Sequence, residues 1–356
     1  TMNWSAEPDT APWIVGSINT DVGSVPKVDT TLNWRDRFGS WKARWGVNRM
    51  RYWVKPGLYA VGTPTSESPV FVTANYKMSF DRLRSALHGI DGWILVLDTK
   101  GINVWCAAGK GTFGTDEIVR QVEDTKLKDI VSHDRLVVPQ LGAPGVAAHE
   151  VKQQTGFRVV YGPVRAQDIP AFLDAKMKAT REMRRVEFPL ADRLAVVPVE
   201  IVQSAKWAFV IAAIFFLLSG FGPSGYSWNT TLSTGLVSAT LVIFAYILGA
   251  VITPIMLPWL PGRSLALKGL WTGIGLCLIV GFGLWQLDST WLSHWELAAL
   301  TLVVLATASF MAMKFTGSTT YTSLSGVRRE MRVAVPLQAV GCTLGVALWI
   351  AGRFMS

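Results

Sequence analysis

The chain has 356 residues, of which 50% are hydrophobic and 17% charged, and its mean hydropathy is +0.31. This composition is too apolar for an ordinary soluble enzyme, and the net charge of +9 is too modest to indicate nucleic-acid binding. Only seven of the 34 basic and three of the 25 acidic residues lie from Trp207 onward. The composition therefore predicts a charged soluble part followed by a membrane part.

The beginning of the chain is irregular. Residues 1–65 are rich in tryptophan and show no clear period, as in NWRDRFGSWKARWGVNRMRYW. The first residues have neither the basic start nor the apolar run of a signal peptide. We predict that residues 1–65 form an arm that wraps around the following domain.

Residues 66–185 alternate between strand and helix patterns, which predicts an α/β domain with a parallel, Rossmann-like sheet. Short apolar runs predict strands at 68–74, 92–98, 135–142 and 157–163. Helical periods predict helices at 78–90, 115–125, 145–156 and 166–179. Ser79 and Thr115 are the expected N-caps of the first two helices.

Ligands of parallel sheets bind beyond the carboxyl ends of the strands. The segments that follow these ends are 73–75, 99–106, 140–145 and 162–166. Several of these segments are rich in Gly or other small residues. This pattern predicts room for a large planar ligand.

A linker is predicted at 186–205, and a membrane domain at 206–353. Five apolar segments lie in it, at 206–222, 231–252, 265–287, 296–313 and 333–352. Each approaches the roughly 20 residues that a spanning helix needs. So few charges favour five membrane spans over the buried helices of a soluble protein. The scarcity of ionisable residues within the spans favours anchoring or partner docking over transport.

Basic residues alternate between the segments that connect the spans. They are abundant before the first span, absent from 223–230 and 288–295, and present in the other two loops. The positive-inside rule then predicts a multi-pass protein of the cytoplasmic membrane, with its N-terminal domain in the cytoplasm and its C-terminus outside.

Several familiar motifs fail on inspection. GKGTFG (109–114) has the spacing of a dinucleotide fingerprint but does not directly follow a strand. The chain has no Cys-x-x-Cys pair for zinc or iron–sulfur, and no nucleophile elbow. None of the four histidines lies in the Asp-x-His-x-x-Gly context of many cobalamin proteins.

Cys106 is the only cysteine of the first 206 residues, and it follows a predicted strand end. Three interpretations are open: a packing residue, a nucleophile without a nearby base, or a metal ligand. The beginning of a short helix would favour the thiolate. One thiolate cannot hold a zinc ion alone, but it can be the axial ligand of a metal held by a macrocycle. The three cysteines show no disulfide pattern, which fits a reducing compartment.

The segment NVWCAAGK (103–110) closely resembles the signature of the HgcA family, the membrane-anchored corrinoid proteins of microbial mercury methylation. SPVFVTANYKMSFDRLR (68–84) and GPVRAQDIP (162–170) resemble further parts of that family's corrinoid domain. This domain is similar to the one in the corrinoid iron–sulfur protein of the acetyl-CoA pathway. The resemblance covers the chain from about residue 50 and includes the five spans.

The resemblance implies a corrinoid (cobalamin or another cobamide) with Cys106 as the lower axial ligand of its cobalt and as the catalytic residue. Asn103, Val104 and Trp105 would belong to the cap helix under the corrin. Further cofactor-binding residues are implied at the strand ends and in the loop around the nucleotide tail: Thr73, Asn75, Ser79, Gly142, Gly145, Gly162, Pro163, Val164, Arg165 and Ala166.

The implied activity is a corrinoid-dependent methyltransferase that transfers a methyl group to Hg(II) and forms methylmercury. The implied partners are the ferredoxin-type iron–sulfur protein HgcB, for electrons and Hg(II) delivery, and a methyl-folate-linked methyl donor. Membrane lipid surrounds the spans, and no nucleic acid is expected. Two alternatives remain: a corrinoid methyl carrier of one-carbon or acetyl-CoA metabolism, and a membrane cobalamin-binding or transport protein without turnover.

Overall fold

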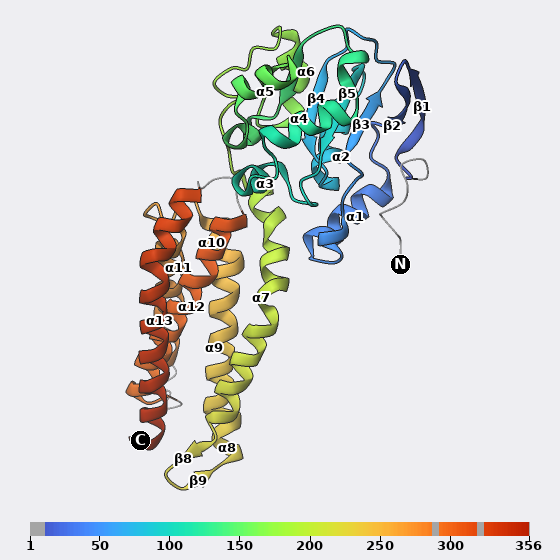
Figure 1. Cartoon of the computed structure of the whole chain (residues 1–356). Coiled ribbons are helices and arrows are strands. Elements are labelled where there is room, and N and C mark those ends of the chain that lie inside the picture. The colour runs from blue at the N-terminus through green and yellow to red at the C-terminus, as the bar shows by residue number, and fades with distance from the viewer. Residues whose placement is uncertain (1–10, 287–291, 319–323, 356) are drawn as a thin grey trace. The chain divides into compact units, whose positions relative to one another are not determined.

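The computed structural model describes residues 11–286, 292–318 and 324–355 (Figure 1). The chain divides into two compact units, Thr1–Val186 and Glu187–Ser356. The first unit is an α/β domain and the second is helical, apart from a small hairpin. The predicted fold class is therefore confirmed.

The first unit is built on one seven-stranded sheet with the order β1-β2-β3-β5-β4-β6-β7. Its strands are β1 (Ile14–Thr20), β2 (Gly23–Val28), β3 (Gly57–Val61), β4 (Val70–Ala74), β5 (Gly92–Leu97), β6 (Arg135–Val138) and β7 (Arg158–Tyr161). The four strands from β4 to β7 are mutually parallel, as predicted. Every residue of β4 and β5 is buried, which is typical of strands covered on both faces.

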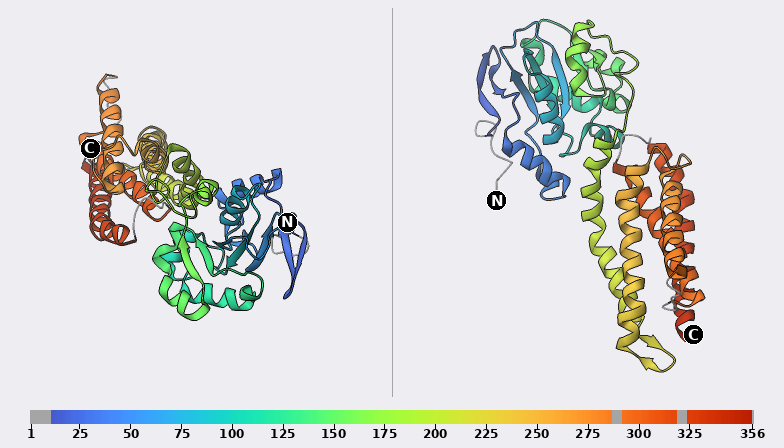
Figure 2. Two further views of the ribbon diagram at one scale, coloured as in Figure 1. Left: turned by 90° about the horizontal axis from the view of Figure 1, so that it is seen from above. Right: turned by 180° about the vertical axis from the view of Figure 1, so that it is seen from behind.

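Helices cover both faces of this sheet (Figures 1 and 2). One core lies between the sheet and α3 (Val104–Lys110), α4 (Thr115–Asp124) and α5 (Ala148–Thr155). The other lies against α2 (Lys77–Ala86) and α6 (Ile169–Asp174). The remaining elements of this unit are α1 (Trp34–Arg44) and the short helices η2 (Arg49–Arg51), η3 (Leu127–Asp129), η4 (Gln140–Gly145) and η5 (Ala166–Asp168).

The N-terminal segment differs from the predicted arm. It contributes three strands to the sheet, and β3 pairs with β5 in antiparallel orientation. The run Leu58–Val61 is fully buried, so it behaves as a core strand although it is only four residues long. Residues 1–10 of the predicted arm lie outside the described residues.

Some local predictions are also corrected. The predicted strand 135–142 ends at Val138, because Pro139 follows and cannot donate a ladder hydrogen bond. Ser79 is not an N-cap: α2 begins at Lys77, after Tyr76, so Ser79 already lies in its first turn. Thr115 is the first residue of α4, and its hydroxyl accepts a hydrogen bond from Ala147 N–H at 2.9 Å.

The second unit contains five helical segments that are long and apolar enough to span a membrane. The first is α7 (Leu190–Leu218), the third α11 (Leu265–Gln286), the fourth α12 (His294–Ser318) and the fifth α13 (Leu324–Met355). The second is continuous from α8 (Trp228–Thr230) through η6 (Thr231–Gly235), α9 (Leu236–Ile247) and η7 (Leu248–Ile252) to α10 (Thr253–Met256). The two-stranded hairpin of β8 (Phe221–Gly222) and β9 (Gly225–Tyr226) precedes α8.

The predicted linker 186–205 is mostly helical, because α7 extends back to Leu190. Residues 288–291 of one predicted loop lie outside the described residues. Within the unit, charges are satisfied locally: Arg353 Nη1 lies 2.7 Å from Glu296 Oε1, and Lys268 Nζ donates to two backbone carbonyls. Charges paired in this way suit a helical bundle in a medium of low polarity.

Candidate functional site

The candidate site lies at the carboxyl edge of the parallel strands, where the chain leaves β5 and forms α3. The connection is tight, since Lys100 and Gly101 both adopt positive φ angles (58° and 71°). A non-glycine residue in this conformation is strained and needs support from its surroundings. The support comes from the residue that follows the neighbouring strand β4.

That residue is Asn75, which is buried and forms the centre of the connection. Its Oδ1 accepts hydrogen bonds from Thr99 Oγ1 (2.8 Å), Thr99 N–H (3.2 Å) and Gly101 N–H (2.9 Å). Its Nδ2 donates to Asp98 Oδ1 at 3.3 Å. Asn75 was predicted as a cofactor-binding residue, but its amide is used within the protein. It therefore acts as a positioning residue for the loop that leads to α3.

Replacing Asn75 with alanine is expected to lower the free energy of unfolding by about 1–3 kcal/mol, because it leaves the buried Gly101 N–H without its acceptor, whereas Thr99 keeps the carbonyls of Leu97 and Ile102. Chemical denaturation of the full chain, followed by near-ultraviolet circular dichroism, would measure this change. The matched control is Asn19→Ala at an exposed strand position, which should leave the midpoint unchanged. Equal midpoints for Asn75→Ala and the parent would contradict the positioning role.

Cys106 is the third residue of α3 and is half-buried. Asn103 caps the helix, since its Oδ1 accepts a hydrogen bond from Cys106 N–H at 2.9 Å. Val104, Ala107 and Ala108 face the core, so α3 is anchored on the side away from the thiol. The sequence signature thus combines one inward apolar face with one partly exposed thiol.

The protonation of Cys106 differs from the expectation of a stabilised thiolate. Burial raises the pKa of the thiol, and this outweighs the opposing influence of Lys110, Asn103 and Arg49. Without a metal, the thiol is therefore protonated at neutral pH. Binding to a metal ion would displace that proton, since coordinated thiols are deprotonated.

Two residues that interact electrostatically with the thiol, Arg49 and Tyr76, were not predicted from the sequence. The Arg49 guanidinium lies 5.7 Å from the centre of the Tyr76 ring, and the Tyr76 hydroxyl lies 3.1 Å from Met78 Sδ. Burial raises the pKa of Tyr76, and the Cys106 side chain acts in the same direction. Arg49 comes from the N-terminal segment, which carried no sequence signal for this site.

The glycines of the site have a different role from the predicted one. A Cβ on Gly142 would lie 2.3 Å from the Phe113 ring, and one on Gly145 would lie 2.2 Å from the Phe113 carbonyl oxygen. These glycines let η4 pack closely against the residues that follow α3. Close packing within the protein therefore explains these glycines. They do not indicate space for a ligand.

The other predicted site residues follow the ends of adjacent strands but differ in exposure. Thr73, Gly162 and Pro163 are buried, as is Val104 on the inward face of α3. Partly exposed are Ser79, Asn103, Trp105, Cys106, Gly145, Val164, Arg165 and Ala166. Contact of these residues with a cofactor stays a prediction.

Two polar side-chain atoms near α3 have no hydrogen-bond partner among the described residues. These buried atoms are Thr112 Oγ1, which follows α3, and Gln140 Oε1, at the beginning of η4. An unsatisfied buried polar atom costs free energy, so such atoms indicate a missing partner. A ligand with amide groups at its periphery could supply it.

The described residues contain no group of three or more His, Cys, Asp or Glu side chains that could hold a metal ion. The three cysteines are free and separate. Any metal at Cys106 must therefore be held mainly by something other than this chain, such as a macrocycle.

The first unit is similar to known proteins. Residues 48–173 match the family described as the CO dehydrogenase/acetyl-CoA synthase delta subunit. The gamma subunit of the acetyl-CoA decarbonylase/synthase complex of Archaeoglobus fulgidus is 35% identical over 123 residues, which are 34% of this chain and 26% of that protein. The corresponding subunit of Methanopyrus kandleri is 34% identical over 123 residues, with the same shares.

The chain thus spans about a quarter of the length of these curated relatives, and the matches cover about a third of the chain itself. They confirm the predicted relationship of the first unit to subunits of acetyl-CoA synthase complexes. The family match begins at residue 48, so the segment that provides Arg49 is included in it.

Proposed function

We propose that this protein is a corrinoid-dependent methyltransferase that transfers a methyl group to Hg(II) and forms methylmercury. The observation that carries the proposal is the placement of Cys106, a partly exposed thiol on a capped helix at the carboxyl edge of the sheet. The described residues contain no group of three or more His, Cys, Asp or Glu side chains that could hold a metal ion elsewhere. The relatives support the corrinoid, and the resemblance of NVWCAAGK supports the mercury substrate.

The residues present fit a corrinoid. Cys106 would be the protein ligand of the cobalt, and Ser79, Trp105 and Val164 would contact the macrocycle from three neighbouring segments. The unpaired oxygens of Thr112 and Gln140 could accept hydrogen bonds from its peripheral amides. When bound, the corrinoid would supply a methyl group on cobalt, and the soft, electron-donating thiolate of Cys106 would favour its transfer to an electrophile.

The chain's own residues hold the thiolate in place. Asn103 fixes the first turn of α3, and Asn75 fixes the loop before it. The cations of Lys110 and Arg49 favour the anionic sulfur once its proton has left. Together these contacts would keep a single sulfur ligand directed at the cofactor during turnover.

We further propose that electrons and Hg(II) come from partner proteins in the cytoplasm. Hg(II) in cells is bound by thiols, and its capture requires at least two accessible sulfurs. Cys106 would be occupied, and Cys277 and Cys342 lie in helices of the second unit. A ferredoxin-type iron–sulfur protein such as HgcB would supply both functions, and a methyl-folate-linked donor would supply the methyl group.

A second function is favoured by the curated relatives, which are named as subunits of acetyl-CoA decarbonylase/synthase complexes. In this alternative the protein is a corrinoid methyl carrier of one-carbon metabolism, and mercury is an accidental acceptor. The same bound corrinoid would serve both functions, so only the acceptor distinguishes them.

The purified full chain is expected to bind about one corrinoid per chain and, with a reductant and a methyl donor, to convert Hg(II) to methylmercury. A visible spectrum and cobalt analysis would measure the first, and mass spectrometry of methylmercury the second. Failure to take up cobalamin would refute both candidate functions. Uptake of cobalamin with methyl transfer to other acceptors, but none to Hg(II), would leave only the carrier.

A further inference from the structure

The exposed face of α1 has no role in the candidate site. Trp34, Phe38 and Trp41 are 65%, 49% and 55% exposed. With Trp45 they lie within about 60° of one another around the helix, at 100° per residue. Phe38 stacks on Trp41 with ring centres 5.8 Å apart, so these rings form one continuous aromatic stripe.

The opposite face of α1 holds the helix on the first unit. Asp36, Gly39 and Ala43 are buried, and a Cβ on Gly39 would lie 2.8 Å from the Tyr52 hydroxyl. Asp36 pairs with Lys77 at 2.9 Å and with Arg84 at 2.8 Å. The aromatic stripe is therefore unnecessary for attaching α1, yet it exposes large apolar rings at an energetic cost.

Cations flank the stripe on both sides. Arg35 and Lys42 lie along one border, Arg37 and Arg44 along the other, following the same helical spacing. The sequence from 30 to 66 has seven basic residues and a single acid, which is the buried Asp36. An amphipathic helix with aromatic rings between two rows of cations is typical of a helix that lies in a membrane interface.

The chain itself limits how far the first unit can lie from a bilayer. Its five long apolar helices are suited to a membrane, and residues 175–189 connect α6 to the first of them. This connection can extend at most about 50 Å, so the first unit stays within reach of a bilayer that these helices span. Such tethering raises the effective concentration of the surface and lets a short helix bind.

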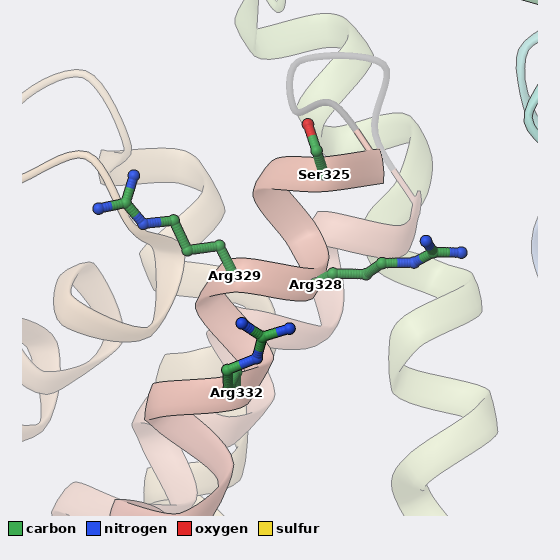
Figure 3. A pocket seen from close by; sticks show the side chains of 4 residues that line it. All are labelled: Ser325, Arg328, Arg329 and Arg332. Carbon is green, nitrogen blue, oxygen red and sulfur yellow. The ribbon is translucent and has the colours of Figure 1, made fainter.

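The second unit carries its own basic surface, formed by Arg328, Arg329 and Arg332 with Ser325 at the beginning of α13 (Figure 3). The three side chains spread around the helix instead of converging, which suits several headgroups better than one bound ion. Exposed apolar residues such as Val333 and Leu337 follow directly. These cations would complement anionic headgroups at the surface of a membrane.

We propose that the aromatic stripe of α1, Trp34, Phe38 and Trp41, lies on the surface of an anionic lipid bilayer, with its flanking cations at the lipid phosphates. This contact would restrict the first unit, including the Cys106 helix, to an orientation set by the membrane. It is independent of the methyl acceptor, so it holds whichever candidate function is correct.

Hydrogen–deuterium exchange of residues 34–45 tests the proposal, with the full chain in nanodiscs of phosphatidylcholine alone or mixed with phosphatidylglycerol. Exchange is expected to be at least about fivefold slower in the mixed membrane, since each cation at an anionic surface is worth about fivefold in binding. The variant Trp34→Ser/Phe38→Ser/Trp41→Ser should lose this protection in both membranes. Arg35→Ser/Lys42→Ser should keep the protection by the rings and weaken the dependence on phosphatidylglycerol, because Arg37 and Arg44 remain.

The charge-matched control is Lys126→Ser/Lys128→Ser, which removes two exposed cations elsewhere on the first unit. It should keep the parental exchange of α1, and all variants should keep the parental thermal midpoint. Exchange of α1 that is the same in both membranes and insensitive to the triple substitution would overturn the proposal. Protection that appears only after an acidic ferredoxin is added would also overturn it, in favour of a protein partner.

Discussion

Replacing Cys106 with alanine is expected to reduce methylmercury formation below detection while the protein stays folded and still takes up corrinoid. Cys106 is the only cysteine of the first unit, since the two other cysteines lie in the membrane-type helices. Its side chain is half-buried and α3 is anchored through Val104, Ala107 and Ala108, so the truncation leaves the core intact. The two measurements are methylmercury yield and the visible absorption of the bound corrinoid.

Three variants make this prediction specific. Cys106→His is expected to bind cobalt but to work poorly, because imidazole is a harder donor with a longer ring that would shift α3. Cys277→Ala and Cys342→Ala remove a thiol of the same type from the second unit and should be close to neutral. If Cys106→Ala forms methylmercury at the parental rate, the thiolate has no part in the reaction and Cys106 is a packing residue.

The second large effect is expected for Asp36→Asn, which should lower the free energy of unfolding by about 3–5 kcal/mol. Asp36 lies in a buried cluster with Lys77, Asp81 and Arg84, in which Lys77 Nζ is 2.5 Å from Asp81 and Arg84 Nε is 2.7 Å from it. Removing one negative charge leaves two buried cations to share a single carboxylate. The Asn side chain has nearly the same volume as Asp and leaves no cavity. The change in the free energy of unfolding therefore reflects the lost charge and hydrogen bonding.

The cluster also predicts a pH dependence. Burial alone would raise the pKa of Asp36, but Lys77 and Arg84 outweigh it and hold the pKa below its ordinary value. The ionised Asp36 carboxylate therefore contributes its full stabilisation at pH values above the pKa of an unfolded aspartate, about 3.9. The contribution is lost as the pH falls through the lower, folded value. Thermal midpoints of parent and Asp36→Asn should consequently converge as the solution is acidified.

A matched control is Asp134→Asn, which breaks an exposed pair with Arg158 at 2.8 Å. This pair is screened by solvent, and its loss should leave the midpoint unchanged. Equal midpoints for Asp36→Asn and the parent at neutral pH would show that the buried cluster does not hold α1 on the first unit. The docking of the N-terminal segment would then depend on its apolar contacts alone.

The sequence by itself determined the elements whose pattern is local. The parallel strands β4 and β5 were recognised as short apolar runs, because both of their faces are buried and each run is continuous. The five apolar helices were recognised because a bilayer requires about 20 residues without charge, whatever their neighbours are. Cys106 could be singled out because its segment resembles the signature of a known family.

Only the tertiary structure decided how distant segments complete the sheet and the site. β1 was missed because it is mostly exposed and has no apolar run. β3 was missed although it is as long as β4, because it follows the irregular, tryptophan-rich segment and pairs with β5 only in the folded sheet. Arg49 reaches the surroundings of Cys106, and Asp36 reaches Lys77 and Arg84, through contacts between residues far apart in the chain. The sequence alone does not indicate which partner a charged residue has, since burial and pairing arise only when the chain has folded.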